Sequence, residues 1–308
     1  MNFVHALKKN SNQNGKVGTG GKGVGGGLKH FLHSSLAGER EARSLATIHA
    51  SEVTREDPKF CPREIALLDI TGKKRESEFL STSMSVVFEL GWRIQYMVTD
   101  WLASIAVGDW TCRKCRNVAA FCSRPSACGK CGSSVRWDYE ECRFESTVTG
   151  ISAGIDVLVQ LDGPALGVVE IKSIDKDKFK TLVAPLAEHR LRTNLYLRVI
   201  AESGESHRRH LIDTTKACVL YVSKGGYGVK DTSLKEAGLV DGGYSPFKEF
   251  TVERNDEETD EVCTRAKLAH DFRASKVMPG GVCETSFCPR AKSCPVLKEC
   301  FSGSYPSQ

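Results

Sequence analysis

The stretch from Gly154 to Lys172 restricts the possible folds of this chain more than any other. It consists of two short β-rich runs, each with an acid at its edge, on either side of the turn signal Asp162-Gly163-Pro164. This pattern predicts an antiparallel hairpin, which would bring Asp156 close to Glu170 and Lys172. Because Glu170 and Lys172 are two residues apart, their side chains project from the same face of their strand.

Two carboxylates and a lysine at one point suit a divalent cation and the stabilisation of a pentavalent phosphate. Asp156, the hairpin and Glu170-Ile171-Lys172 together resemble the D…(E/D)xK core of the PD-(D/E)XK nuclease superfamily. The resemblance implies an α/β fold with a restriction-endonuclease-like core, in which helices flank a mixed central sheet. The alternative is an edge strand that carries an ExK triplet for solubility.

Length and composition set the broad class of the protein. With 308 residues and 40% hydrophobic content, the chain can bury one substantial α/β core with insertions, or one core and a small module. No window is apolar enough for a membrane span, and residues 1–14 lack the apolar core of a secretory signal. We therefore expect a soluble protein of the cytoplasm, or of the host cytoplasm if a phage encodes it. Thirteen cysteines in such a compartment favour metal sites over disulfides.

The positive charge is concentrated near the N-terminus. Residues 1–50 carry seven lysines and arginines against two glutamates, which equals the whole net charge of +5. Residues 1–30 are rich in glycine and basic, so we expect a flexible arm there and a nuclease domain over 31–308. Any nucleic-acid groove in the folded body must then be a local basic patch.

Two cysteine pairs have the spacing of a zinc ribbon. Cys112 and Cys115 are followed after twelve residues by Cys128 and Cys131. Each pair can take two corners of a tetrahedron around Zn²⁺, and Cys122, in the intervening loop, could replace one ligand. We expect the ribbon to be an insertion over residues 109–136. Its basic residues suggest DNA contact, and the alternative is a structural staple.

A helix is expected between Met84 and Ala106, where apolar residues recur every three or four positions. In the RecB-like branch of the superfamily, this helix carries a GxxxH motif whose histidine joins the metal site. Here Gly91 is followed at that spacing by Gln95, which is either a site residue or an ordinary surface residue. The resemblance implies that Asp156, Glu170, the carbonyl of Ile171 and Gln95 hold Mg²⁺ or Mn²⁺, and that Lys172 orients the attacking water.

Further elements follow the hairpin. A helix over 185–201 places Arg192 four residues before Tyr196, which partly resembles the Q…Y pattern of RecB-like nucleases and implies contact with the DNA backbone. The alternative is a solvated basic face. Strands are expected over 217–222 and 247–252, and a helix over 256–275 that is capped by Asn255.

The C-terminal segment carries four cysteines in eighteen residues: Cys283, Cys288, Cys294 and Cys300. This density indicates a metal site. Together with Cys61, which precedes Pro62, the segment resembles iron-sulfur RecB-like nucleases, including CRISPR adaptation nucleases and phage-type exonucleases. In these proteins one early and three late cysteines hold a [4Fe-4S] cluster. The resemblance implies that the ligands of such a cluster are Cys61, Cys294, Cys300 and either Cys283 or Cys288. The alternative is that these cysteines hold a second Zn²⁺.

The resemblance as a whole implies a deoxyribonuclease that depends on Mg²⁺ or Mn²⁺. It points to an exonuclease at single- or double-stranded DNA ends, in phage or mobile-element recombination or replication, with a recombination or annealing protein as an open possibility for a partner. One alternative is a catalytically inactive DNA-binding or scaffold protein that uses the zinc ribbon. The other is an endonuclease of the same fold.

Overall fold

The computed structural model describes residues 28–40, 47–75, 78–134, 136–161, 163–225, 228–230, 232, 236–237 and 244–302. Apart from its last three residues, the flexible arm predicted for residues 1–30 lies outside these ranges, as does Asp162 of the predicted turn. Within them the mixed α/β architecture is confirmed. None of the described helices is both long and apolar enough to cross a membrane.

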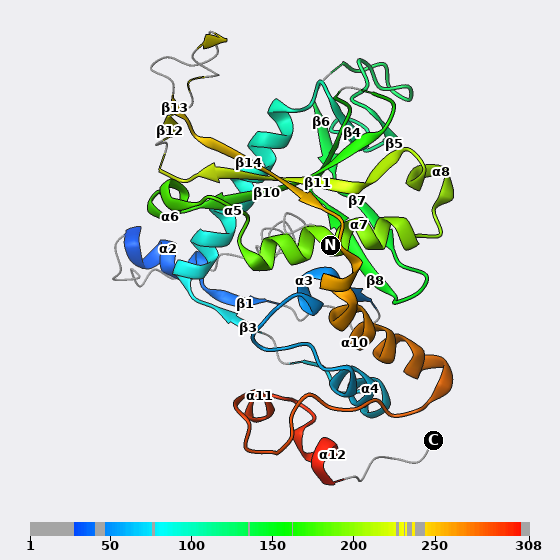
Figure 1. The fold of residues 1–308 in the computed structure, drawn as a ribbon. Coiled ribbons are helices and arrows are strands. Elements are labelled where there is room, and N and C mark those ends of the chain that lie inside the picture. Colours follow the sequence, from blue (N-terminus) through cyan, green and yellow to red (C-terminus); the bar gives the residue numbers. More distant parts are fainter. Residues whose placement is uncertain are drawn as a thin grey trace.

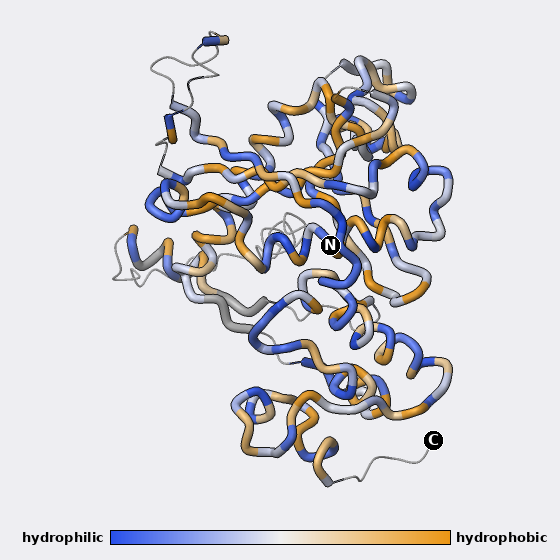
Figure 2. Tube along the Cα trace, viewed as in Figure 1, coloured by the Kyte–Doolittle hydropathy of each residue, from blue (hydrophilic) through white to orange (hydrophobic). Residues whose placement is uncertain are grey.

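A seven-stranded mixed sheet forms the centre of the molecule (Figure 1). Its strands are β4 (Ala106–Cys112), β5 (Val118–Ser123), β6 (Trp137–Glu140), β9 (Val157–Val159), β10 (Leu166–Ile174), β11 (Ile212–Ser223) and β14 (Phe247–Glu253). Their order is β14-β11-β10-β9-β4-β5, with β6 also paired to β4. Only β10 and β11 run parallel among these pairs, and the crossover between them contains α6 (Lys176–Thr181), α7 (Ala187–Glu202) and α8 (Ser206–Arg209). Hydrophobic residues follow the central strands (Figure 2).

A second, smaller sheet lies beside the first and has the order β2-β8-β7. It consists of β2 (Ile48–His49), β7 (Cys142–Glu145) and β8 (Ile151–Ile155). Two short pairs are peripheral: β1 (Gly38–Arg40) with β3 (Glu78–Leu80), and β12 (Val229–Lys230) with β13 (Tyr244–Ser245). The remaining described helices are α2 (Leu28–Leu36), α3 (Ala50–Val53), α4 (Pro62–Thr71), α5 (Thr82–Trp101), α10 (Asp256–Ser275), α11 (Pro289–Lys292) and α12 (Leu297–Ser302).

The predicted hairpin is present as β9 and β10, which pair antiparallel with Val157 opposite Val169. Asp156 stands between β8 and β9, where the chain leaves the smaller sheet and joins the larger one. Side chains alternate along β10, so Glu170 and Lys172 share a face with Val168, while Val169 and Ile171 point the other way.

Two helices cover the opposite faces of the large sheet. Val168 belongs to the same hydrophobic cluster as Leu195 of α7, while Val169 and Ile171 belong to the cluster that contains Val98 of α5. Glu170 and Lys172 therefore lie on the α7 side of the sheet, at its border with the smaller sheet.

The predicted helix is present as α5, but it ends at Trp101, and Ala106 begins β4. Its exposed residues also differ from the apolar face expected from the sequence. Val98 is buried and Ile94 packs against the core, whereas Met84, Val87 and Trp101 are exposed. The helix contacts the main sheet through β10, and its remaining principal contacts among the described elements are α2 and β3. Much of the periodic apolar face therefore has no core to pack against among the described residues.

The predicted cap of α10 is confirmed, and α4 also begins with residues typical of a helix N-terminus. Asn255 Oδ1 accepts a hydrogen bond of 3.1 Å from Glu257 N at the start of α10. Cys61 is the N-cap of α4, and Pro62 occupies its first turn. Helix α4 packs against α10 and α12 and lies beside the C-terminal segment (Figure 1). Cys61 therefore lies next to the C-terminal cysteines.

Candidate active site

The structure brings together the three charged residues that the sequence singled out. Asp156 and Glu170 are buried, with 8% and 1% of their surface exposed. Asp156 Oδ2 accepts a hydrogen bond of 2.8 Å from Ile171 N, which fixes the carboxylate beside β10. Lys172 Nζ forms an ion pair with Glu170 Oε1 and lies 3.8 Å from Asp156 Oδ2. The hairpin and the alternation along β10 produce this arrangement.

The carboxylate pair could hold a cation. Glu170 Oε2 is buried and has no hydrogen-bond partner among the described residues. Burial and the nearby Glu170 raise the pKa of Asp156 well above that of an ordinary aspartate. A buried carboxylate oxygen without a partner is costly, and a hard divalent cation with oxygen ligands would satisfy it. Asp156, Glu170 and the main chain of Ile171 offer such oxygens.

Gln95 reaches the site from α5 and faces it with its amide nitrogen. Gln95 Nε2 donates hydrogen bonds of 3.0 Å to Asp156 Oδ1 and 3.0 Å to Glu141 Oε1. The two ends of an amide are assigned from such hydrogen bonds, so in this arrangement Gln95 is a donor to two carboxylates. A metal contact through Oε1 requires the amide to rotate.

Glu141 is a site residue that the sequence analysis did not identify. It lies between β6 and β7, and it joins the site because β7 pairs with β8 and sets Arg143 opposite Gly154. A Cβ at Gly154 would stand 2.9 Å from Glu141 Oε2, so glycine leaves room for this carboxylate. A glycine inside a strand often marks such a close approach, and this was the signal available in the sequence.

Helix α7 forms the wall opposite the carboxylates. Tyr196 is 7% exposed, and burial together with Glu170 and Asp156 raises the pKa of its hydroxyl well above the usual value. Arg192 is paired with Glu188 at 2.5 Å, and its Nε also donates to Thr54 Oγ1 at 3.4 Å. Both predicted DNA-contacting residues thus lie on α7 near the site, Tyr196 within the core and Arg192 in an ion pair.

His189, also on α7, lies near the same charges. Its Nδ1 is 2.8 Å from the hydroxyl of Tyr221, and burial with the positive charges of Lys172 and Arg192 lowers its pKa to about 4. The imidazole is therefore neutral at pH 7 and adds no positive charge to those of Lys172 and Arg192.

The four cysteines of the predicted ribbon form a compact group. The Sγ atoms of Cys112, Cys115, Cys128 and Cys131 all lie within 4.8 Å of one another. Cys112 Sγ is 3.9 Å from Cys131 Sγ, and Cys115 Sγ is 3.6 Å from Cys128 Sγ. This group could hold a metal ion. Cys122 lies on β5 and Cys142 on β7, both outside it.

The main chain around each cysteine pair makes the same tight turn. Arg116 N donates to Cys112 O and Gly132 N donates to Cys128 O, each at 2.8 Å. Arg116 and Gly132 have φ angles of 60° and 67°, so each pair is followed by a left-handed residue. These turns lie at the ends of strands of the large sheet, on the opposite side of the molecule from α11 and α12 (Figure 1).

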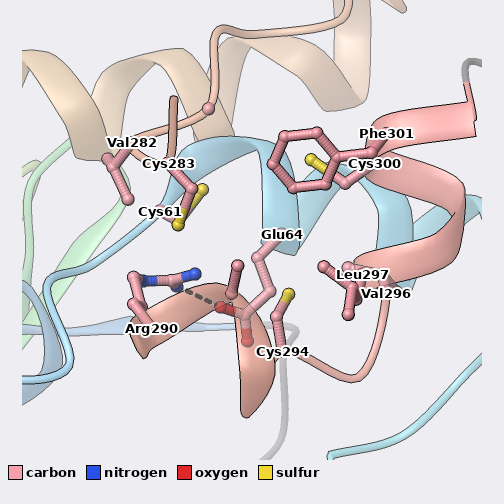
Figure 3. A pocket seen from close by; sticks show the side chains of 12 residues that line it. Cys61, Glu64, Val282, Cys283, Arg290, Cys294, Val296, Leu297, Cys300 and Phe301 are labelled. Carbon is pink, nitrogen blue, oxygen red and sulfur yellow. Dashed lines mark hydrogen bonds and ion pairs between the residues drawn. The ribbon is translucent and has the colours of Figure 1, made fainter. Parts of the chain in front are cut away.

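A second group of cysteines lines a cavity between α4 and the C-terminal segment. Cys61, Cys283, Cys294 and Cys300 surround it, with Glu64 and Arg290 beside them (Figure 3). Glu64 forms ion pairs with Arg75 Nε, at 3.0 Å, and with Arg290. Among the described residues, no three of these cysteines have Sγ atoms that all lie within 4.8 Å of one another, so this group is wider than the first.

Cys288 stands outside the lining of this cavity. Its Sγ lies 3.0 Å from Cys283 Sγ and accepts a hydrogen bond of 3.4 Å from Ala291 N, as the N-cap of α11. The thiol of Cys283 and this N–H lower the pKa of Cys288. The geometry thus gives the two candidates for the fourth ligand different environments: Cys283 lines the cavity and Cys288 caps a helix.

No protein-family model and no curated protein matches the sequence. Among solved structures, the chain is similar to an alkaline exonuclease from Laribacter hongkongensis, with 12% identity, a TM-score of 0.38, and coverage of 80% of this chain and 93% of that chain. The structure of that exonuclease in complex with dAMP gives 15% identity, a TM-score of 0.38 and coverage of 75% and 89%. The chain is also similar to a phage related exonuclease from Haemophilus somnus 129PT, with 12% identity, a TM-score of 0.35, and coverage of 73% of this chain and 92% of that chain. At these TM-scores, a functional assignment depends on the side-chain geometry described above.

A cation bound between Asp156 and Glu170 should stabilise the protein against heat. Mn²⁺ at about 100 times its dissociation constant should raise the melting temperature by about 3 to 8 °C in a thermal-shift measurement. The shift should be lost in Glu170→Gln and kept in Glu145→Gln, an exposed glutamate on β7. It should shrink as the pH falls, because protons compete for Asp156, whose pKa is raised. Equal shifts in the parent and Glu170→Gln would contradict a cation at this position.

Proposed function

We propose that this protein is a deoxyribonuclease that depends on Mg²⁺ or Mn²⁺ and hydrolyses phosphodiester bonds. The observation that carries the proposal is the buried pair Asp156 and Glu170, with an unpartnered oxygen on Glu170 and with Lys172 in contact with both carboxylates. A surface ExK triplet kept for solubility does not require a buried glutamate, and Glu170 is 1% exposed.

Asp156, Glu170 and the carbonyl of Ile171 would hold the divalent cation. When bound, such a cation lowers the pKa of a coordinated water and neutralises charge on the scissile phosphate. Burial alone would lower the pKa of Lys172, but Glu170 and Asp156 raise it overall. Lys172 therefore stays protonated at neutral pH, and it would orient the water and stabilise negative charge on the pentavalent phosphate without serving as a general base.

Gln95 and Glu141 would position Asp156. The hydrogen bonds from Gln95 Nε2 restrain the carboxylates of Asp156 and Glu141 from the α5 side. The RecB-like motif has a histidine at the position of Gln95. Because an amide is neutral, this position supplies orientation without adding a titratable group. Arg192, on the opposite wall, would contact the DNA backbone near the scissile phosphate by exchanging Glu188 for a phosphate oxygen. Tyr196, which the sequence also suggested for this contact, is 7% exposed and would line the wall behind Arg192.

The resemblance to RecB-like nucleases supports a more specific assignment. The protein would be an exonuclease that acts on single- or double-stranded ends of linear DNA, in phage or mobile-element recombination or replication. Its domain would extend over residues 31–308, with 109–136 as an inserted zinc ribbon and 283–301 as an iron-sulfur segment. A recombination or annealing protein would be the kind of partner that such a role requires.

The two cysteine groups would hold different cofactors. Tetrahedral Zn²⁺ with Zn–S distances of about 2.3 Å separates its sulfurs by roughly 3.8 Å, close to the 3.6 and 3.9 Å of the first group. The second group is too wide for a single ion in this arrangement, and a [4Fe-4S] cluster places several atoms between its thiolates. We assign Zn²⁺ to the first group and the cluster to Cys61, Cys283, Cys294 and Cys300.

The nuclease proposal predicts that the charged residues are required for DNA degradation. Asp156→Asn and Lys172→Ala should each reduce Mn²⁺-dependent release of nucleotides from end-labelled linear DNA by at least about 100-fold. Glu145→Gln should cut like the parent. Covalently closed circular DNA should resist an exonuclease, whereas its cleavage would favour an endonuclease. Retained DNA binding without cleavage by the parent would instead favour the inactive scaffold.

The cofactor assignment predicts distinct metal contents. Protein purified without oxygen should be brown and contain about four iron atoms and one zinc atom per chain. Elemental analysis of Cys294→Ser should show a loss of iron with zinc retained, and Cys128→Ser should show the reverse. Zinc in both cysteine groups of the parent, with no iron, would contradict the cluster.

A further inference from the structure

Three aromatic residues form a row along α5 that the catalytic site does not use. Phe88, Trp92 and Tyr96 are spaced four residues apart, so they lie along one side of the helix. Phe88 is 40% exposed, and Trp92 and Tyr96 are half-buried. The rings of Trp92 and Tyr96 are stacked, with their centroids 5.7 Å apart and their planes inclined by 28°. This aromatic row is therefore partly open to solvent.

The row adjoins Gln95, which contacts two carboxylates of the site, those of Asp156 and Glu141. Gln95 precedes Tyr96 in the sequence and donates to Asp156 at 3.0 Å. Gly91 precedes Trp92, and a Cβ at Gly91 would be 3.7 Å from Ser173 Oγ on β10. Gly91 and Gln95 thus face the sheet, and the aromatic residues occupy the next positions around the helix. A nucleotide next to a phosphate at Asp156 would therefore lie close to Trp92 and Tyr96.

Arginines accompany the rings. The guanidinium of Arg93 lies over Trp92, with Cζ 5.1 Å from the ring centroid, and its side chain is 68% exposed. It is paired with Glu89 at 2.7 Å, an exposed i,i+4 pair that contributes little stability and that a phosphate can replace. Arg113 donates from Nη2 to the hydroxyl of Tyr96.

Arg113 also connects the row to the first cysteine group. It follows Cys112, and its Nε donates to Asp138 Oδ1 at 2.6 Å. Arg116, in the same turn, is 60% exposed, with its Nη1 3.7 Å from Asp138 Oδ2. Guanidinium groups therefore stand along the row from Trp92 to the cysteine turn. Alternating rings and guanidinium groups suit a nucleotide chain, whose bases stack on aromatic faces and whose phosphates pair with arginine.

We propose that the aromatic row is a stacking platform for single-stranded DNA, which guides an unpaired strand between the carboxylates and the cysteine turns. The choice of DNA rests on the proposed nuclease function of the neighbouring site. The choice of a single strand rests on the rings, because the bases of an intact duplex are already stacked on one another and do not present their faces. The protein would then engage a frayed or resected end more tightly than a blunt one.

Binding of fluorescently labelled DNA to the full chain, measured by anisotropy without added Mg²⁺ or Mn²⁺, tests this platform without cleavage. Trp92→Ala should weaken binding of an oligothymidine strand by about 5- to 50-fold, which corresponds to the loss of one stacked base. Binding of a blunt duplex should change less than about twofold. Trp92→Phe should retain most of the affinity, because it keeps an aromatic face.

Trp101→Ala is the matched control. Trp101 lies on the same helix and is 58% exposed, but it packs edge-on against Phe247, with ring centroids 6.2 Å apart. Its replacement should leave binding of the single strand unchanged. Equal weakening by Trp92→Ala and Trp101→Ala, or equal weakening for the single strand and the blunt duplex, would overturn the platform. An altered oligomeric state of Trp92→Ala with unchanged DNA affinity would overturn it in favour of a protein interface.

The test separates the platform from the nuclease assignment. If Asp156→Asn loses cleavage while Trp92→Ala binds the single strand like the parent, the platform is wrong and the nuclease site stands. If Trp92→Ala weakens binding but Asp156→Asn cleaves like the parent, the platform stands and the catalytic assignment is wrong. Binding of an RNA strand at least about tenfold more tightly than DNA of the same base composition would overturn the choice of DNA.

Discussion

The hydrogen bond from Ile171 N to Asp156 Oδ2 joins β10 to the point where the chain passes from β8 to β9, and the arrangement of the site depends on it. Asp156 stands where the chain passes from the smaller sheet to the larger one, and this bond fixes its carboxylate beside β10. The same strand carries Glu170 and Lys172, so one main-chain contact sets the distance between the two acids. Gln95 completes the restraint from α5, while the wall formed by α7 lies on the other side.

The burial of these charged side chains lowers the stability of the folded protein. Glu170 is nearly inaccessible, and burial and mutual repulsion raise the pKa of Asp156. Lys172 offsets only part of this negative charge, since Glu141 lies on the far side of Gln95. Such a cluster is expected where a cation is bound, because the cation supplies the missing positive charge. The partly exposed aromatic rings of α5 also lie outside the core, where their burial does not stabilise the fold.

Local signals in the sequence were sufficient for much of the framework. The turn residues and two short apolar runs predicted β9 and β10, Asn255 predicted the start of α10, and cysteine spacing predicted the close approach of the first four cysteines. Each of these features depends on residues close together in the chain, or on a spacing that permits one geometry. The joint approach of Asp156, Glu170 and Lys172 followed from the hairpin and the alternation of side chains.

Features that depend on tertiary packing could not be predicted in this way. Glu141 reaches the site only because β7 pairs with β8 and Gly154 leaves space for it. The distinction between Cys283 and Cys288 depends on how the C-terminal segment folds against α4. The apolar periodicity of α5 predicted a helix but not which of its residues are covered, because much of that face has little to pack against among the described elements.

The most direct test of the site is a crystal structure of the protein soaked with Mn²⁺, with the ion located by its anomalous scattering. If the site works as proposed, one Mn²⁺ will lie within about 2.0 to 2.3 Å of carboxylate oxygens of both Asp156 and Glu170, next to the carbonyl of Ile171. Mn²⁺ bound at full occupancy elsewhere on the protein, with none between Asp156 and Glu170, would contradict the proposed mechanism.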